Sequence, residues 1–263
     1  MGSCFVSFCF VLFIFQFDYV DAVTICLIDS GIDTLKYPMF KRGVSIFDGK
    51  LTQEFNDSLG HGTGMFEIIL NNTVINNLNL IICKFIHSYG FGDVLDAIKC
   101  IQYCVENKVD IINASWEGSG HFVLSNFLLE SIKQNKIIFV SVAGNNHINI
   151  DISQKFPSKY SNKMYNIYSD YFITVTGIKI DNYGYGHNTV QLLAPDVWNA
   201  SFKIGFLGYF TLSGTSVSAA YTTGKIYNLL KRGIPPMCIK NYLINSSLHV
   251  ENITDNLTSG GII

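Results

Sequence analysis

Continuous apolar runs that alternate with helical stretches constrain this fold more than any other feature of the sequence. Strands that are buried on both faces read as unbroken apolar runs, and helices between them connect parallel strands. The sequence therefore predicts an α/β fold: a doubly wound, mainly parallel sheet with helices on both faces. The expected strands are "VTICLID" (23–29), "LIICKF" (80–85), "VDIINAS" (109–115), "IIFVSVAG" (137–144), "YFITVTGI" (171–178) and "VQLLAP" (190–195); the expected helices start near His61, cover 93–107 and 124–136, and follow Ser216.

Residues 23–263 are expected to form one domain. With 263 residues, of which 48% are hydrophobic, the chain can bury a full core. No internal repeat or Pro/Gly-rich linker divides it. The net charge of −2 provides no basic field for a nucleic-acid backbone and no polybasic membrane patch, so nucleic acid is not expected as a partner.

Residues 1–22 have the features of a signal peptide. An apolar run from Cys4 to Phe17 is too short to span a bilayer comfortably, and it is followed by Val20-Asp21-Ala22. No Lys or Arg precedes the run, so a buried N-terminal strand or helix is the alternative. No transmembrane helix is expected after residue 22, and the chain is predicted to be secreted or held at the cell surface.

The cysteines do not predict a closed disulfide framework. Removal of residues 1–22 would take two of the seven cysteines and leave five, an odd number. Cys26 and Cys83 lie in apolar runs and are expected to be small core residues. Cys100 and Cys104 share one helical face, and whether they pair stays open.

No metal and no cofactor are expected. The sequence lacks a CxxC pattern, which argues against structural zinc. Four acidic residues between positions 29 and 61 have no calcium-loop spacing, so a solvated acidic loop is the favoured interpretation over a cation site. These residues are Asp33, Asp48, Glu54 and Asp57.

Four polar residues at the ends of predicted elements form a set suited to acyl transfer. Asp29 ends the first strand, His61 starts a helix between glycines, Asn145 follows "VSVAG", and Ser216 lies at the start of a helix. A serine hydroxyl needs an adjacent base, which in turn needs a carboxylate to orient it, and the oxyanion needs donors. Ser216 alone could be a simple helix cap, but the four together favour catalysis.

The motifs "DSG", "GHGTG", "AGNN" and "GTSVSAA" resemble those of the subtilases, the subtilisin-like serine proteases, across nearly all of residues 23–263. The resemblance implies a secreted serine endopeptidase that acts on proteins or peptides through an acyl-enzyme. It further implies that Asp29, His61 and Ser216 are catalytic and that Asn145 binds the oxyanion. Substrate-binding residues would be Ser115, Trp116, Glu117 and Gly118 in "SWEG", Gly90 and Gly92 in "YGFGD", and Ala143 and Gly144 in "AGNN".

The sequence departs from the family pattern in several places. Gly64, Ala220 and Tyr221 stand where the family usually has histidine, proline and histidine. No propeptide is evident between the signal and the first strand, so a separate inhibitor or folding partner could supply that role. The alternative function is a catalytically weak or inactive relative that acts as a secreted or surface binding protein.

Glu117 stands where subtilases commonly have glycine at the wall of the pocket that precedes the scissile bond. Its carboxylate could attract Arg or Lys there, because carboxylate contacts to guanidinium are strong and directional. It could instead fold across the pocket and close it, or turn to solvent without effect.

Overall fold

A computed structural model describes residues 22–74, 78–118, 123–162, 164, 168–200, 210–248, 258 and 260–263. The described part of the chain contains one eight-stranded sheet, in which only β2 and β3 pair antiparallel. The predicted doubly wound α/β architecture is therefore confirmed. In sheet order the strands are β3 (Lys50–Thr52), β2 (Gly43–Phe47), β4 (Leu78–Lys84), β1 (Val23–Asp29), β5 (Ile111–Ala114), β6 (Ile138–Val142), β7 (Phe172–Gly177) and β8 (Leu192–Ala194).

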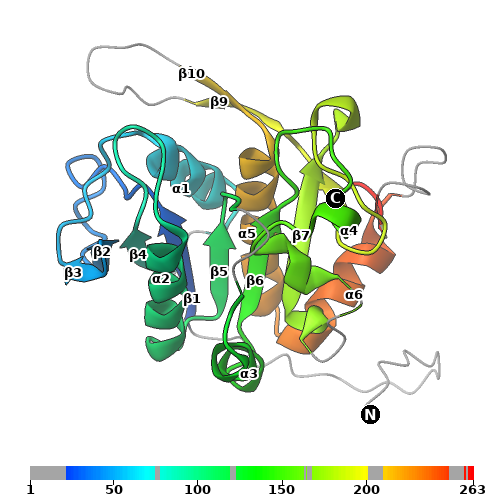
Figure 1. Ribbon diagram of the computed structural model, residues 1–263, viewed down its shortest axis with the longest axis horizontal. Helices are drawn as coiled ribbons and strands as arrows, with labels where there is room; N and C mark the ends of the chain where they lie inside the picture. The colour runs from blue at the N-terminus through cyan, green and yellow to red at the C-terminus, as the bar shows by residue number, and fades with distance from the viewer. Residues whose placement is uncertain are drawn as a thin grey trace.

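Helices cover both faces of this sheet (Figure 1). On one face α1 packs against α5, and α5 also contacts the central strands; on the other face α2 packs against β1, β2 and β4 and beside α3. The helices are α1 (His61–Asn71), α2 (Val94–Glu106), α3 (Asn126–Gln134), α4 (Ile150–Ser153), α5 (Thr215–Lys231) and α6 (Pro236–Ser246), with short 3-10 turns at Ser158–Ser161, Ser169–Tyr171 and Ile180–Asn182.

The central strand β1 shows how the continuous apolar pattern builds two cores. Successive side chains of a strand point to opposite faces. Val23, Ile25 and Leu27 accordingly join the cluster under α1 and α5, whereas Cys26 and Ile28 join the cluster under α2 and α3. All five side chains are fully buried, so this strand is fixed by burial on both sides.

The sequence did not predict several peripheral elements. β2 and the exposed β3 form the edge of the sheet, and β9 (Val197–Ala200) pairs with β10 (Phe210–Ser213) as a separate antiparallel ribbon. α6 starts at Pro236 and packs against α5. The expected signal peptide is residues 1–22. Of these, only Ala22 lies within the described residues. Among the helices described, none has the length and apolar character needed to cross a membrane.

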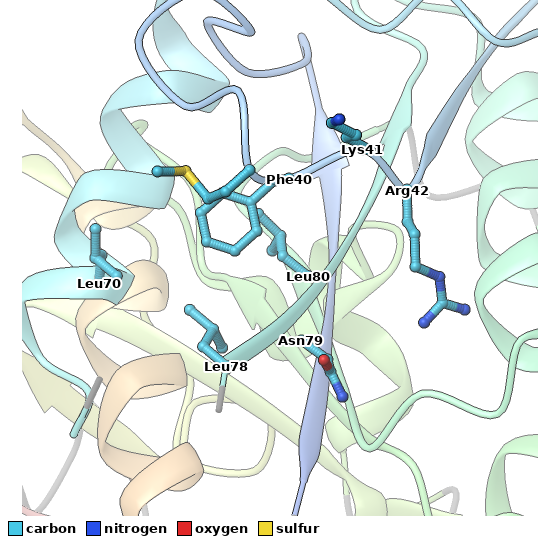
Figure 2. Close-up of a pocket in the computed structure, with 8 residues that line it drawn as sticks. Phe40, Lys41, Arg42, Leu70, Leu78, Asn79 and Leu80 are labelled. Atoms are coloured by element: carbon cyan, nitrogen blue, oxygen red, sulfur yellow. The ribbon is translucent and has the colours of Figure 1, made fainter. Parts of the chain in front are cut away.

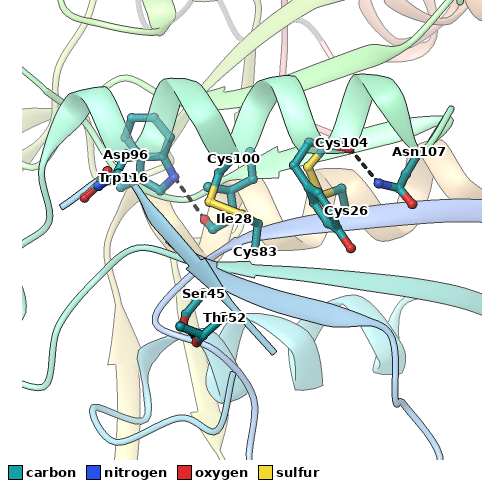
Figure 3. The surroundings of a disulfide bond; sticks show 12 residues. Cys26, Ile28, Ser45, Thr52, Cys83, Asp96, Cys100, Cys104, Asn107 and Trp116 are labelled. Atoms are coloured by element: carbon teal, nitrogen blue, oxygen red, sulfur yellow. Dashed lines mark hydrogen bonds between the residues drawn. A yellow bond between two sulfur atoms is a disulfide. The ribbon is translucent and has the colours of Figure 1, made fainter. Parts of the chain in front are cut away.

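Two disulfides join α2 to the sheet (Figure 3). Cys104 bonds to Cys26 on β1, and Cys100 bonds to Cys83 on β4. Cys26 and Cys83 are buried core residues, as predicted. The expectation that the cysteines form no disulfide framework was wrong. Cys100 and Cys104 lie four residues apart on the helix face that packs against the sheet, which brings each within reach of a neighbouring strand. Cys238 lies outside both disulfides.

Candidate active site

The end of β1 and the start of α1 bring Asp29 and His61 into direct contact. His61 Nδ1 lies 2.8 Å from Asp29 Oδ1, and the backbone N–H of Ser30 donates to the same oxygen at 2.7 Å. This approach depends on Gly62, because a Cβ there would lie 2.2 Å from the carbonyl oxygen of Gly31. The helix can therefore start close enough to the strand for an imidazole to meet a buried carboxylate.

The electrostatics of this pair favour a basic imidazole. Asp29 is fully buried, and its Oδ2 has no hydrogen-bond partner among the described residues. Burial by itself lowers the pKa of His61, but the charge and hydrogen bond of Asp29, with a further contribution from Asp57, leave that pKa raised above its usual value. The carboxylate thus makes the His61 imidazole more basic, as a general base requires.

Asp57 holds the start of α1 in place. Its Oδ1 accepts hydrogen bonds from the Ser30 hydroxyl at 2.9 Å and from the N–H of Gly60 at 2.8 Å. Its Oδ2 accepts from the N–H of Thr63 at 2.8 Å and from the Thr63 hydroxyl at 2.6 Å. The favoured interpretation of this acid as part of a solvated loop was wrong, because it caps the helix that carries His61.

Ser216 lies in the first turn of α5, where helix N–H groups are free to meet negative charge. Its Oγ donates to the carbonyl oxygen of Ser115 at 2.8 Å, and the Ser115 hydroxyl donates to the carbonyl oxygen of Ser216 at 3.2 Å. Within the described part of the chain, no hydrogen bond joins Ser216 to His61. Ser216, the predicted nucleophile, is therefore placed by α5 and oriented by Ser115.

A buried polar chain supports Ser115. The amide of Asn113 donates to the Ser115 hydroxyl at 2.9 Å and accepts from the Thr223 hydroxyl at 2.9 Å. Asn113 is fully buried, so both of its hydrogen bonds are shielded from water. The chain of contacts connects β5 to the middle of α5 and fixes the segment that follows β5 against the helix that carries Ser216.

Asn145 lies beside the same helix start. Its Oδ1 accepts from the N–H and the hydroxyl of Thr215 at 3.0 and 3.1 Å. Its amide nitrogen forms no hydrogen bond with the residues that the structure describes, and the side chain is exposed. Thr215 thus orients the amide so that an N–H donor is left for an external acceptor.

The predicted substrate-binding residues occupy several different environments. Gly118 pairs with Phe156 in an antiparallel bridge, and Ala143 is fully buried. Gly90 faces open space, whereas a Cβ on Gly92 would lie 2.4 Å from the carbonyl oxygen of Phe85. Gly90 therefore leaves space at the surface for an extended substrate, whereas position 92 must be glycine because the Phe85 backbone packs against it.

Trp116 and Glu117 point in different directions from adjacent positions. The Trp116 indole is almost buried among aromatic side chains and donates to the Ile28 carbonyl at 2.9 Å, so it supports the strand that ends in Asp29 (Figure 3). The Glu117 carboxylate instead lies against Gly144. The side chain of Trp116, one of the predicted substrate-binding residues, thus belongs to the core.

A separate cavity of about 340 Å³ lies at the opposite end of the sheet (Figure 2). Leu78 on its wall pairs with Val23, six residues before Asp29 on β1. At about 3.3 Å per residue, roughly 20 Å of strand separates this cavity from the Asp29–His61 pair. It is therefore not part of the candidate active site. Its lining residues are Met39, Phe40, Lys41, Arg42, Leu70, Leu78, Asn79 and Leu80.

Comparison with known proteins identifies the family of this chain. The model described as "Subtilase family" matches residues 21–260. Subtilisin-like protease 2 of Plasmodium falciparum is 30% identical over 233 residues, covering 77% of this chain and 16% of that protein. Subtilisin-like protease 1 of Plasmodium berghei (strain Anka) is 25% identical over 301 residues, covering 93% of this chain and 49% of its own length. The chain thus spans half or less of these relatives.

Solved structures share the fold. The A subunit of the AB5 toxin from E. coli aligns with a TM-score of 0.74 and 20% identity, covering 92% of this chain and 90% of the toxin subunit. A cold-adapted subtilisin-like serine proteinase aligns with a TM-score of 0.65 and 21% identity, covering 92% and 89% of the two chains. Together with the family match over residues 21–260, this likeness means that the chain belongs to the subtilase family of serine peptidases.

Proposed function

We propose that this chain is a secreted serine endopeptidase that hydrolyses peptide bonds through Asp29, His61 and Ser216. The observation that carries the proposal is the 2.8 Å contact between His61 Nδ1 and a buried Asp29, at the same edge of the sheet as Ser216 and Asn145. A carboxylate that holds one imidazole nitrogen leaves the other available to accept a proton. Family membership supports peptides as the substrates.

In the proposed first half of the reaction, Ser216 Oγ leaves the Ser115 carbonyl and donates to His61 Nε2. As Oγ attacks the carbonyl carbon of the substrate, Nε2 takes the hydroxyl proton, and Asp29 stabilises the resulting imidazolium. The Asn145 amide and the Ser216 N–H donate to the oxyanion. His61 then gives the proton to the leaving amine, the C–N bond breaks, and the acyl group stays on Ser216.

In the second half, a water molecule replaces the amine. His61 takes a proton from the water as its oxygen attacks the ester carbonyl, and the same two donors meet the second oxyanion. When the intermediate collapses, the bond to Ser216 breaks and His61 returns the proton to Oγ. The carboxylate product leaves with the enzyme restored.

A fluorophosphonate probe tests the nucleophile directly, because an activated serine displaces its fluoride and is phosphonylated without a requirement for a particular peptide. We expect the purified wild-type protein to be labelled on Ser216 and Ser216→Ala to be unlabelled. Ser58→Ala is the matched control, since this exposed serine precedes His61 in the same loop and should leave labelling unchanged. A folded wild-type protein that is not labelled would contradict the proposed function.

Passage through the secretory pathway is part of the same proposal. The two disulfides support it, because disulfides persist in oxidising compartments and are rare in the reducing cytosol. The test is N-terminal sequencing of protein that a eukaryotic host exports. We expect a start near Val23, and retention of Met1 in exported protein would contradict cleavage of a signal peptide.

A further inference from the structure

Glu117 lies between two segments that would meet the reacting bond: the segment of Ser115, which contacts Ser216, and the segment of Gly144 and Asn145. It is two residues after Ser115, which accepts the hydrogen bond from Ser216 Oγ, and it is followed by Gly118, which pairs with Phe156. Its carboxylate crosses to Gly144, the residue before Asn145. The side chain therefore joins the wall that contacts the nucleophile to the wall that carries the proposed oxyanion donor.

The bare backbone of Gly144 makes room for this carboxylate. A Cβ on Gly144 would lie 2.3 Å from Glu117 Oε2 and 2.8 Å from Cδ. Real side-chain atoms do not approach so closely, so any larger residue at position 144 would displace the carboxylate. The location of the negative charge is thus set by two positions, one on each wall.

The carboxylate is incompletely satisfied in this position. Oε2 is buried and has no hydrogen-bond partner among the described residues. Oε1 lies 3.8 Å from Lys155 Nζ, which is too long for a direct hydrogen bond. Burial raises the pKa of Glu117 above its usual value, and the charge of Lys155 offsets this only in part. A buried carboxylate with free acceptor capacity is costly unless a cation with N–H donors meets it.

We infer that Glu117 receives the cationic side chain of an Arg or Lys that precedes the scissile bond of the substrate. This inference rests on the proposed function and adds the class of substrate. A guanidinium presents parallel N–H donors to both carboxylate oxygens, so Arg should be preferred to Lys. Lys155 is about one quarter exposed and can move into solvent when the substrate's cation arrives.

The first experiment compares peptides that differ only in the residue before the scissile bond, with Arg, Lys, Leu, Phe or Glu at that position. We expect the wild type to show the highest kcat/KM with Arg. In Glu117→Gln, which keeps the shape and removes the charge, the ratio of Arg to Leu should fall about 10- to 100-fold, the range for a lost hydrogen bond to a charged group. Glu106→Gln, an exposed acid at the end of α2, is the control and should keep the wild-type ratio.

The second experiment measures cation binding without turnover. p-Aminobenzamidine, an aromatic amidinium whose fluorescence rises in an apolar pocket, is titrated into Ser216→Ala and into Ser216→Ala/Glu117→Gln. We expect saturable binding to the first protein and at least a tenfold weaker Kd in the second. Thermal melts confirm that both proteins are folded. Because this readout needs no nucleophile, it separates failure of the cation site from failure of the proposed hydrolysis.

Three results would overturn the inference. One is that folded Ser216→Ala binds no p-aminobenzamidine, or binds it equally well without the Glu117 carboxylate. Another is that the wild type cleaves Leu and Arg peptides equally, with the same ratio in Glu117→Gln. The third is that Glu117→Gly gains activity on Leu and Phe peptides with no loss of an Arg preference, which would mean that Glu117 obstructs the pocket instead of recognising a cation.

Discussion

Ser216 Oγ donates to the carbonyl oxygen of Ser115 at 2.8 Å and makes no hydrogen bond to His61 in the part of the chain that the structure describes. The proposed base is already oriented, since His61 Nδ1 meets Asp29 at 2.8 Å. Rotation about the Cα–Cβ bond of Ser216 is therefore the step that would complete the triad. Hydrogen bonds of this kind commonly form only when substrate binds, so the resting contact with Ser115 is compatible with activity.

The rate of fluorophosphonate labelling should depend on pH through His61. Only the neutral imidazole accepts the Ser216 proton, so labelling should slow as the pH falls through the raised pKa of His61. Asp29→Asn removes the charge that raises this pKa, which should shift the midpoint to lower pH. The same change should slow labelling by about four orders of magnitude, because the amide favours the wrong tautomer. A pH series of labelling rates for both proteins measures these effects.

Two outcomes would remove Asp29 from this role. One is an unchanged midpoint in Asp29→Asn, and the other is an unchanged labelling rate. Thermal melts of the variant are the control for folding, because the carboxylate is fully buried and its Oδ1 also accepts the Ser30 N–H.

Asn145→Ala should reduce kcat by about two to three orders of magnitude with little change in KM, because one oxyanion donor is lost. Thr215→Val keeps the shape of the buried Thr215 but removes one of the two hydrogen bonds that orient the Asn145 amide. We expect kcat of Thr215→Val to fall by less, about tenfold, since the backbone N–H of residue 215 still donates to Asn145 Oδ1. Steady-state kinetics on a peptide substrate measure kcat and KM for both variants. Equal activity of wild type and Asn145→Ala would exclude the amide as a donor.

The contact between Asp29 and His61 could be predicted because it depends on topology. Asp29 is the last residue of a buried strand and His61 starts the next helix along the chain, so both were expected at the carboxyl edge of a parallel sheet. The role of Asp57 could not be predicted in the same way. Its bonds to Ser30 and Thr63 depend on how an irregular loop folds back over two elements, and acidic loops are usually solvated.

Asp57→Ala should impair catalysis by moving the start of α1. The carboxylate accepts hydrogen bonds from Ser30 and Thr63, so its loss removes the cap and loosens the imidazole. We expect stability to fall by about 1–2 kcal/mol, the usual cost of a lost cap, and labelling to slow at every pH. Glu54→Gln is the control, as this neighbouring acid is exposed. Asp57→Asn should recover part of the labelling rate, and a rate equal to wild type in Asp57→Ala would contradict the positioning role.

The disulfide pairing is a second feature that could not be predicted from the sequence. The apolar pattern placed Cys26 and Cys83 in strands and Cys100 and Cys104 on one helix face, which is where the structure has them. Pairing depends in addition on how α2 is rotated and shifted over β1 and β4. Side-chain pattern alone does not determine that register, so the cysteines could be located but not connected.

Removal of the two disulfides should destabilise the protein by different amounts. Cys26–Cys104 joins residues 78 apart and Cys83–Cys100 joins residues 17 apart. Loop-closure entropy assigns about 4.5 kcal/mol to the first and about 3 kcal/mol to the second. We therefore expect Cys26→Ala/Cys104→Ala to lower the urea midpoint more than Cys83→Ala/Cys100→Ala. The reverse order, or no change under reducing conditions for wild type, would contradict this assignment.

Glu117→Gln should make the protein more stable at neutral pH, although it is expected to weaken cation recognition. Because burial raises the pKa of Glu117 in the folded state, the folded protein holds this proton more tightly than the unfolded chain. The stability that comes from the protonated form is present at low pH and lost as the pH rises through the folded pKa. Above the folded pKa the wild type carries a charge beside a buried, unpartnered Oε2, and there Gln should raise the melting temperature by about 2–4 °C, equivalent to about 1 kcal/mol. This difference should shrink as the pH falls through the folded pKa, and Lys155→Ala should widen it at pH 7 by removing the only nearby cation described. A wild type that melts above Glu117→Gln at pH 7 would mean that the carboxylate is already satisfied in the free protein.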